Sequence, residues 1–103
     1  MQGYVQNRIT EIAIEYGEGL SKAETAFLME MLPDNDWNLA DLIIGECRTY
    51  YKVENEDARN ARKSLSDKGL IEDDGSYVKI TGRGGIVQDY LYAKEVDYEM
   101  SHY

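Results

Sequence analysis

Apolar residues recur at intervals of three and four along most of this chain, and a period of about 3.6 residues restricts the fold to amphipathic helices around a core. The first such stretch, residues 5–16, ends before Gly17 and Gly19. The second begins at Ser21, where a serine followed three residues later by glutamate forms a capping box, and Pro33 ends it. With 103 residues, one domain with a single core is expected.

A third and a fourth helix follow. Asn38 can cap the third, whose predicted buried face carries four residues: Leu39, Leu42, Ile43 and Cys47. Residues 48–53 lack the helical period and are predicted to lie outside a helix. Asn55 can cap a fourth helix over residues 55–68, which Gly69 stops.

A strand pattern occurs only after this fourth helix. Residues 70–71 and 77–81 are short apolar or alternating runs on either side of the turn-forming residues 73–76, and they predict a hairpin. Gly82–Gly85 is interpreted as a tight turn, and helical spacing then predicts a closing helix to about Val96. The expected fold class is mainly α with a small β-hairpin.

The segment Ala61–Glu72 resembles the end of the recognition helix and the first wing strand of winged helix-turn-helix repressors. Residues 77–84 resemble the second wing strand and the turn into the last helix of that family. Residues 38–43 stand where the family has the first helix of its helix-turn-helix. Together these matches span residues 38–91, about half of the chain, and they imply a winged helix-turn-helix fold.

The resemblance also implies how the chain is organised, as a single winged-helix domain over residues 1–103. The core and closing helix would occupy residues 20–96, with an added helix at residues 1–19 and a tail at residues 97–103. Because the first and last helices each carry an apolar stripe, we expect a homodimer built on one of them. The alternative is that these stripes pack within the monomer.

What the family resemblance implies for function is regulation of transcription, with the helix at residues 55–68 in the major groove of duplex DNA and the wing on the adjacent backbone. On a helical wheel, Ala58, Ala61 and Leu65 form the buried side of this helix. The candidate DNA-binding residues are basic or amide side chains: Asn55, Arg59, Asn60, Arg62, Lys63, Lys79 and Arg83.

The charge of the chain works against phosphate binding. It has 20 acidic and 11 basic residues, a net charge of −9, and acids stand in the first turn of the predicted recognition helix and at the wing tip. The alternative function is a small acidic protein, of a kind found among phage and mobile-element products, that binds a basic host protein surface. Its candidate residues are acids and tyrosines: Glu54, Glu56, Asp57, Glu72, Asp73, Asp74, Tyr50 and Tyr51.

The sequence argues against an enzyme, a cofactor or a metal site. The single cysteine, Cys47, is expected to be a buried inert thiol, and the single histidine, His102, stands next to the C-terminal residue. No Lys-Ser/Thr pair follows Gly82–Gly85, as a phosphate loop would require. No apolar run approaches the roughly 20 residues of a membrane helix, and a cytoplasmic protein without a membrane partner is expected.

Overall fold

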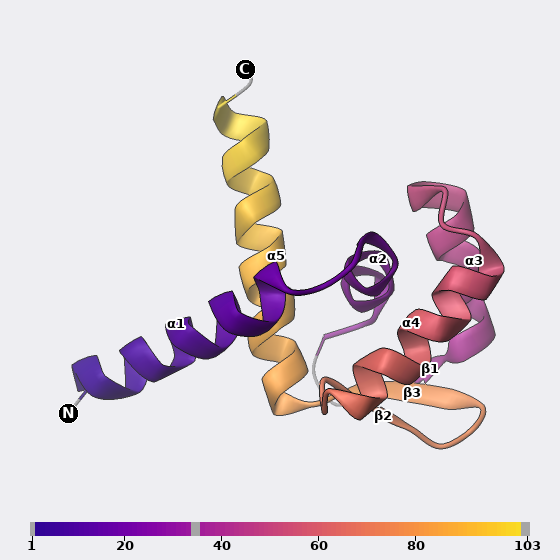
Figure 1. Ribbon diagram of the computed structural model, residues 1–103, viewed down its shortest axis with the longest axis horizontal. Coiled ribbons are helices and arrows are strands. Elements are labelled where there is room, and N and C mark those ends of the chain that lie inside the picture. Colours follow the sequence, from indigo (N-terminus) through magenta and orange to yellow (C-terminus); the bar gives the residue numbers. More distant parts are fainter. Residues whose placement is uncertain (1, 34–35, 102–103) are drawn as a thin grey trace.

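The computed structural model describes residues 2–33 and 36–101, with side chains described for residues 8–33 and 36–95. This part of the chain contains five helices and a three-stranded antiparallel sheet (Figure 1). The elements are α1 (Gln2–Glu18), α2 (Lys22–Glu30), β1 (Asn38–Leu39), α3 (Ala40–Tyr51), α4 (Asn55–Asp67), β2 (Ile71–Asp73), β3 (Tyr77–Ile80) and α5 (Gly82–Ser101). The prediction of a mainly α chain is confirmed.

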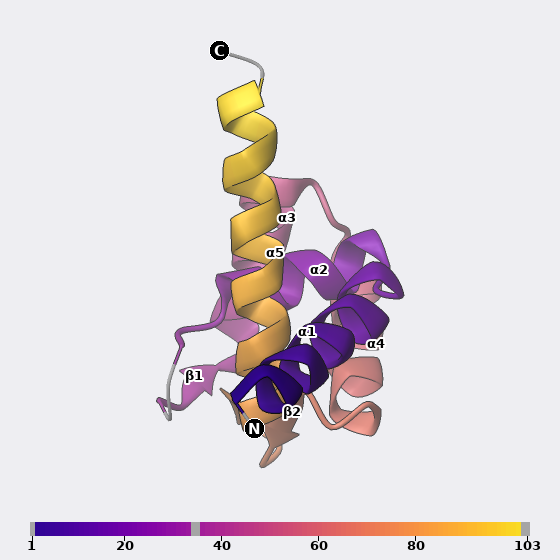
Figure 2. The ribbon, with the colours of Figure 1, turned by 90° about the vertical axis from the view of Figure 1, so that its left-hand side faces the viewer.

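The core lies between α2, α3 and α4 and the inner face of the sheet. Its largest fully buried side chains include Phe27 and Leu28 of α2, Leu65 of α4 and Val78 of β3. α1 packs mainly against α5, and Figures 1 and 2 show the C-terminal half of α5 extending beyond the other elements. The N-terminal end of α1 and the C-terminal end of α5 therefore lie away from the α3–α4 pair.

Several features with local sequence signals form as predicted. The Ser21 hydroxyl accepts a hydrogen bond from the Glu24 N–H at 3.1 Å, and the Glu24 carboxylate accepts one from the Ser21 N–H at 3.0 Å, so the capping box is present. Gly69 follows α4 with φ +74°, a conformation that suits glycine at a helix end. Cys47 is fully buried, and burial together with the nearby carboxylates of Glu30 and Glu46 raises the pKa of its thiol to about 11.

Asn38 does not cap α3, and this corrects the sequence prediction. It lies in β1, which pairs with β3 and was not predicted as a strand. Its buried side chain accepts a hydrogen bond from the Leu32 N–H at 2.9 Å and donates to the carbonyl oxygens of Asp36 at 3.1 Å and Val78 at 3.3 Å. The amide therefore holds together three backbone segments, and Leu39 occupies the N-cap position.

Two of the four residues predicted to form the buried face of α3 are exposed, so this prediction is wrong for them. Ile43 and Cys47 are buried, whereas Leu39 and Leu42 are exposed. The helix starts only at Ala40, so its buried stripe runs through Ala40, Ile43, Ile44 and Cys47. Leu42 projects from the opposite side.

The ends of three helices also differ from the prediction. α3 continues to Tyr51, which packs on the core, and ends where Lys52 adopts φ 57°. Glu54 rather than Asn55 is the N-cap residue of α4, and its side chain makes no capping bond. Gly82–Gly85 forms the first turn of α5, because the Thr81 hydroxyl accepts a hydrogen bond from the Gly84 N–H at 3.0 Å and starts the helix there.

The C-terminal end of α5 also lies later than predicted. The helix continues to Ser101, beyond the expected end near Val96, so it includes most of the predicted tail. His102 lies outside the described residues. Within the described residues, no helix combines the length and apolar character needed to cross a membrane.

Candidate nucleic-acid interface

The α3–α4 pair presents the candidate interface. A short connection, Lys52–Glu54, joins the two helices, and the left-handed backbone of Lys52 reverses the chain direction. α4 is anchored through Ala58, Ala61 and Leu65, as predicted. These contacts use one side of α4 and leave the opposite side outside the core (Figure 1).

Three of the predicted DNA-binding residues share the exposed side of α4. Arg59 and Lys63 are one turn apart and exposed, and Asn60 lies beside them. In the part of the chain that the structure describes, neither cation forms an ion pair. Asn55, at the start of the helix, is half-buried. This face therefore offers two free cations and an exposed amide.

Arg62 is held by the hairpin of β2 and β3. Its guanidinium donates two hydrogen bonds of 2.7 Å, from Nε and Nη2, to the two carboxylate oxygens of Asp73 in β2. The side chains are only 18% and 22% exposed, and the hydrogen bond with Arg62 is the main reason that the pKa of the Asp73 carboxyl lies below its usual value. A bidentate pair of this kind fixes both side chains. Arg62 belongs to the candidate DNA-binding residues and Asp73 to the candidate residues of the alternative function. Their charges neutralise each other.

Lys79 and Arg83 also have partners within the protein. The ammonium of Lys79 lies 3.3 Å from the Glu72 carboxylate and 5.0 Å from the centre of the Trp37 ring. Arg83 donates to the Tyr16 hydroxyl at 3.2 Å and stacks on the same ring, which belongs to α1. The structure therefore does not gather these two cations with those of α4.

The acids of the alternative candidate set divide into two groups. Glu54, Glu56 and Asp57 are exposed near the start of α4. The three acids of the β2–β3 hairpin are engaged within the protein: Glu72 with Lys79, Asp73 with Arg62, and Asp74 with the hairpin turn. The Asp74 carboxylate accepts hydrogen bonds from the N–H groups of Tyr77 and Ser76, which lower its pKa.

The two tyrosines of that set also differ. Tyr50 is largely exposed, whereas Tyr51 is half-buried and lies near Glu30. Burial, with the nearby Glu30 charge, raises the pKa of Tyr51 well above its usual value. The predicted acids and tyrosines therefore do not form one free surface.

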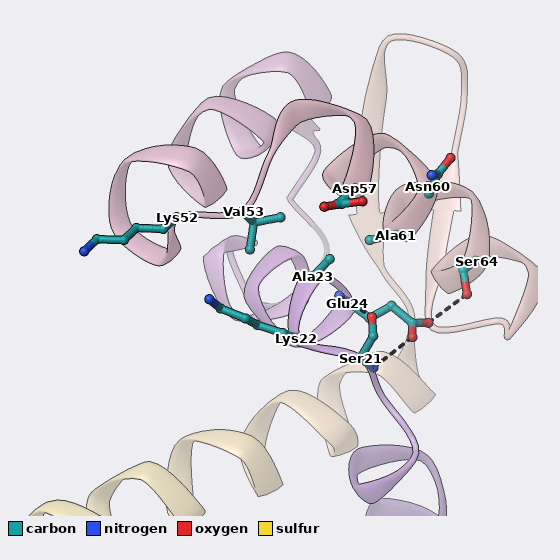
Figure 3. Close-up of a pocket in the computed structure, with 10 residues that line it drawn as sticks. All are labelled: Ser21, Lys22, Ala23, Glu24, Lys52, Val53, Asp57, Asn60, Ala61 and Ser64. Carbon is teal, nitrogen blue, oxygen red and sulfur yellow. Dashed lines mark hydrogen bonds between the residues drawn. The ribbon is translucent and has the colours of Figure 1, made fainter.

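A pocket of about 480 Å³ lies beside this face, between the start of α2, the α3–α4 connection and α4 (Figure 3). Figure 3 shows the side chains of Lys22 and Lys52 at one end and those of Asn60 and Ser64 at the other. Between them, the Glu24 carboxylate accepts hydrogen bonds from the Ser64 hydroxyl at 2.7 Å and the Lys68 ammonium at 2.6 Å, as well as from Ser21.

Glu24 has a structural role in this pocket. Burial raises the pKa of its carboxyl, but the hydrogen bonds from Lys68, Ser21 and Ser64 outweigh that effect and hold the pKa below the usual value. With every oxygen engaged, the carboxylate is poorly placed to act as a base. The capping box revealed the Ser21 contact, but no sequence spacing pointed to Ser64 or Lys68, which lie 40 and 44 residues away.

Among the described residues, no cluster of three or more histidine, cysteine, aspartate or glutamate side chains is arranged to hold a metal ion. Comparison with protein-family models, curated proteins and solved structures gives no match for this chain. The interpretation of its function therefore depends on its own elements, contacts and charges.

Proposed function

We propose that this chain is a winged helix-turn-helix domain that binds duplex DNA through α4. The order α2, α3, α4, β2, β3, α5 supports this proposal, because it is the order that the resemblance to winged-helix repressors implies. In such a domain, α3 and α4 form the helix-turn-helix and α4 enters the major groove. The hairpin of β2 and β3 is the wing.

The distribution of unpaired cations is the observation that carries the proposal. The chain has an excess of acids, and five basic residues form ion pairs within the described part: Arg8, Arg62, Lys68, Lys79 and Lys94. Outside the ion pairs and the Arg83 stack, the described basic residues are Lys22, Arg48, Lys52, Arg59 and Lys63. All but Lys22 belong to α3, α4 or their connection, where a DNA-binding unit needs positive charge.

The residues of α4 suit both kinds of DNA contact. Arg59 and Asn60 lie in the N-terminal half, and both side chain types can form paired hydrogen bonds with purine edges. Lys63, one turn further, can contact a phosphate. Glu56 repels phosphate but can accept a hydrogen bond from the amino group of cytosine, so it can contribute to base choice.

The proposal gives the wing a different role from the one that the family resemblance implies. Arg62 and Lys79 are neutralised by Asp73 and Glu72, and Asp74 lies at the wing turn. An acidic hairpin is a poor partner for the DNA backbone. We therefore propose that α4 and the end of α3 supply the DNA contacts and that the wing braces α4 through the Arg62–Asp73 pair.

Selection of bound sequences from a random duplex pool, followed by titration of a selected duplex at several salt concentrations, tests the proposal. We expect binding that weakens steeply with salt, and a loss of affinity in the double variant Arg59→Gln/Lys63→Gln. Each lost phosphate contact should also reduce the slope of log K against log salt by about one unit.

The matched control is Arg8→Gln/Lys22→Gln, which removes the same charge from exposed positions on α1 and α2. It should retain most of the wild-type affinity. An equal loss in both double variants would mean that only net charge matters. That result would overturn the proposal. So would a failure to bind duplex DNA at about 0.05 M salt, where electrostatic attraction to phosphate is strong.

We further propose that the domain forms a homodimer through α1. On this helix, Ile9 continues the stripe of Ala13, Tyr16 and Gly17. Ala13 is buried, Gly17 lies beside Tyr90 of α5, and Tyr16 contacts Arg83 of α5. Ile9 itself remains 42% exposed. A two-fold partner would cover it and would present two α4 helices to DNA.

Sedimentation velocity measures this association directly. We expect a dimer that Ile9→Asp dissociates, because the substitution places a charge in the apolar contact. Ile14→Ser, at a similarly exposed position (47%) outside the stripe, should leave the dimer intact. A wild-type monomer at micromolar concentration would exclude the proposed dimer.

A further inference from the structure

Strands β1 and β3 and the residues that flank β1 carry large exposed apolar side chains. They are Trp37 (46% exposed), Leu39 (46%), Leu42 (59%) and Tyr77 (45%), and we call them the sheet patch. Figure 2 shows β1, which contains Leu39 and directly follows Trp37, at the side of the molecule. In a chain of this size, isolated exposed apolar residues are ordinary, whereas a contiguous group marks an interaction site.

The pairing of the strands brings Leu39 and Tyr77 together, and Lys79 lies next to Trp37 on the same side of the sheet. Leu39 of β1 is directly opposite Tyr77 of β3, so their side chains share one face of the sheet. Lys79 is two residues beyond Tyr77 on the same face, and its ammonium lies 5.0 Å from the centre of the Trp37 ring. Leu42 follows Leu39 by three residues and projects from the exposed side of α3.

Four exposed acids stand next to members of the sheet patch or to Lys79, two of them in the chain and two through a contact. Asp36 precedes Trp37 in the chain, Asp41 precedes Leu42, and the Asp74 carboxylate accepts a hydrogen bond from the Tyr77 N–H. Glu72 lies beside Lys79. The patch thus has an apolar and aromatic centre with a predominantly acidic rim.

We infer that the sheet patch docks a protein segment in which apolar side chains are flanked by lysine or arginine. Apolar groups would cover the centre, and the basic groups would pair with the acids of the rim. A second copy of this chain would bring the same acids into contact, and DNA would bring phosphates, so both occupants are opposed by like charge. The inference does not depend on DNA binding, because none of the four patch residues lies on α4.

The chain contains a single tryptophan, Trp37, so its emission reports directly on the patch. The probes are three synthetic peptides of about 12 residues without tryptophan or tyrosine, long enough to cross a three-stranded sheet. The first alternates lysine with leucine and phenylalanine, the second replaces each lysine with glutamate, and the third replaces each apolar residue with serine. We expect a saturable blue shift of the emission with the first peptide, none with the second, and about tenfold weaker binding of the third.

Two variants locate the binding site. Leu42→Ser removes the most exposed member of the patch without opening the core, and we expect it to weaken binding of the first peptide about fivefold. Tyr77→Ser provides an independent test from β3. Ile14→Ser removes an apolar side chain of similar exposure from α1 and should bind like wild type. Urea unfolding of each variant verifies that it is folded.

Four outcomes would overturn the inference. Equal binding of the serine and leucine peptides would mean that charge alone attracts them. Unchanged binding in both folded patch variants would place the site elsewhere. A dimer that Leu42→Ser dissociates would make a second copy the occupant, and loss of duplex binding in Leu42→Ser would make it DNA. The Arg59→Gln/Lys63→Gln variant should still bind the first peptide, so failure of the DNA proposal remains distinguishable from failure of this one.

Discussion

Glu24 carries a negative charge in a position that is only 7% exposed. Hydrogen bonds from Ser21, Ser64 and the Lys68 ammonium compensate for the loss of water around it. Although burial raises the pKa of its carboxyl, these three donors hold the pKa below the usual 4.5. A lowered pKa in the folded state stabilises the fold above the pKa of the unfolded chain, and this stabilisation disappears as the pH falls through the folded-state value.

We expect Glu24→Gln to lower the free energy of unfolding near neutral pH by roughly 1–3 kcal/mol, because the Lys68 ammonium loses its charged partner. The difference from wild type should shrink as the pH falls below the pKa of the unfolded chain, about 4.5, and through the lower folded-state pKa. Urea unfolding at a series of pH values measures both effects. The control Glu11→Gln breaks the exposed pair with Arg8 and should change stability by less than about 0.5 kcal/mol. A Glu24→Gln difference that stays constant down to about pH 3 would contradict this account.

Two neighbouring glycines at the start of α5, Gly84 and Gly85, differ in the space available for a side chain. A Cβ atom on Gly84 would lie 1.9 Å from the carbonyl oxygen of Leu70 and 2.9 Å from Ile80 Cγ1. A Cβ atom on Gly85 would meet no heavy atom within 4 Å. The helix therefore packs tightly against the base of the hairpin at Gly84 and leaves free space at Gly85.

We expect Gly84→Ala to destabilise the protein by more than about 2 kcal/mol, because α5 must move away from the Leu70 backbone to admit the methyl group. Gly85→Ala should instead stabilise it by up to about 1 kcal/mol, because alanine favours a helix over glycine and finds free space. Thermal and urea unfolding of the two variants provide the measurement. Effects of the same sign at both positions would show that α5 does not pack on the hairpin as described.

The excess of acids affects the stability of the entire protein. At a net charge of −9, most surface charges repel one another, whereas the ion pairs Arg8–Glu11, Lys79–Glu72 and Lys94–Glu18 are at least partly exposed and individually weak. Raising salt from about 0.1 M to about 1 M shortens the Debye length from about 10 Å to about 3 Å and screens this repulsion. The reduced repulsion should therefore raise the free energy of unfolding by more than the weakened ion pairs lower it.

We expect the unfolding temperature to rise with sodium chloride over this range, by roughly 4–8 °C if screening contributes about 1 kcal/mol. Differential scanning calorimetry measures the change. The Arg59→Gln/Lys63→Gln variant, which is more negative, should show a larger rise. An unfolding temperature that falls with salt would mean that the ion pairs outweigh the general repulsion.

The elements that could be predicted depend on residues close together in the sequence. The Ser21–Glu24 capping box, the buried side of α4 and the hairpin each form from contacts within a few residues, so their signals survive in the amino-acid order alone. The same holds for the exposed cations Arg59 and Lys63, because a helical wheel follows from local geometry.

Tertiary packing decided which of the candidate side chains remain free. Asn38 lies in a strand because its amide satisfies the backbone of Val78, 40 residues away, and Arg62 is neutralised by Asp73, 11 residues away. Such partners meet only when the chain has folded, and the energy of a buried hydrogen bond or ion pair exists only there. Local patterns therefore determined the helices and the hairpin, whereas the third strand, the Arg62–Asp73 pair and the exposed sheet patch followed from contacts between distant segments.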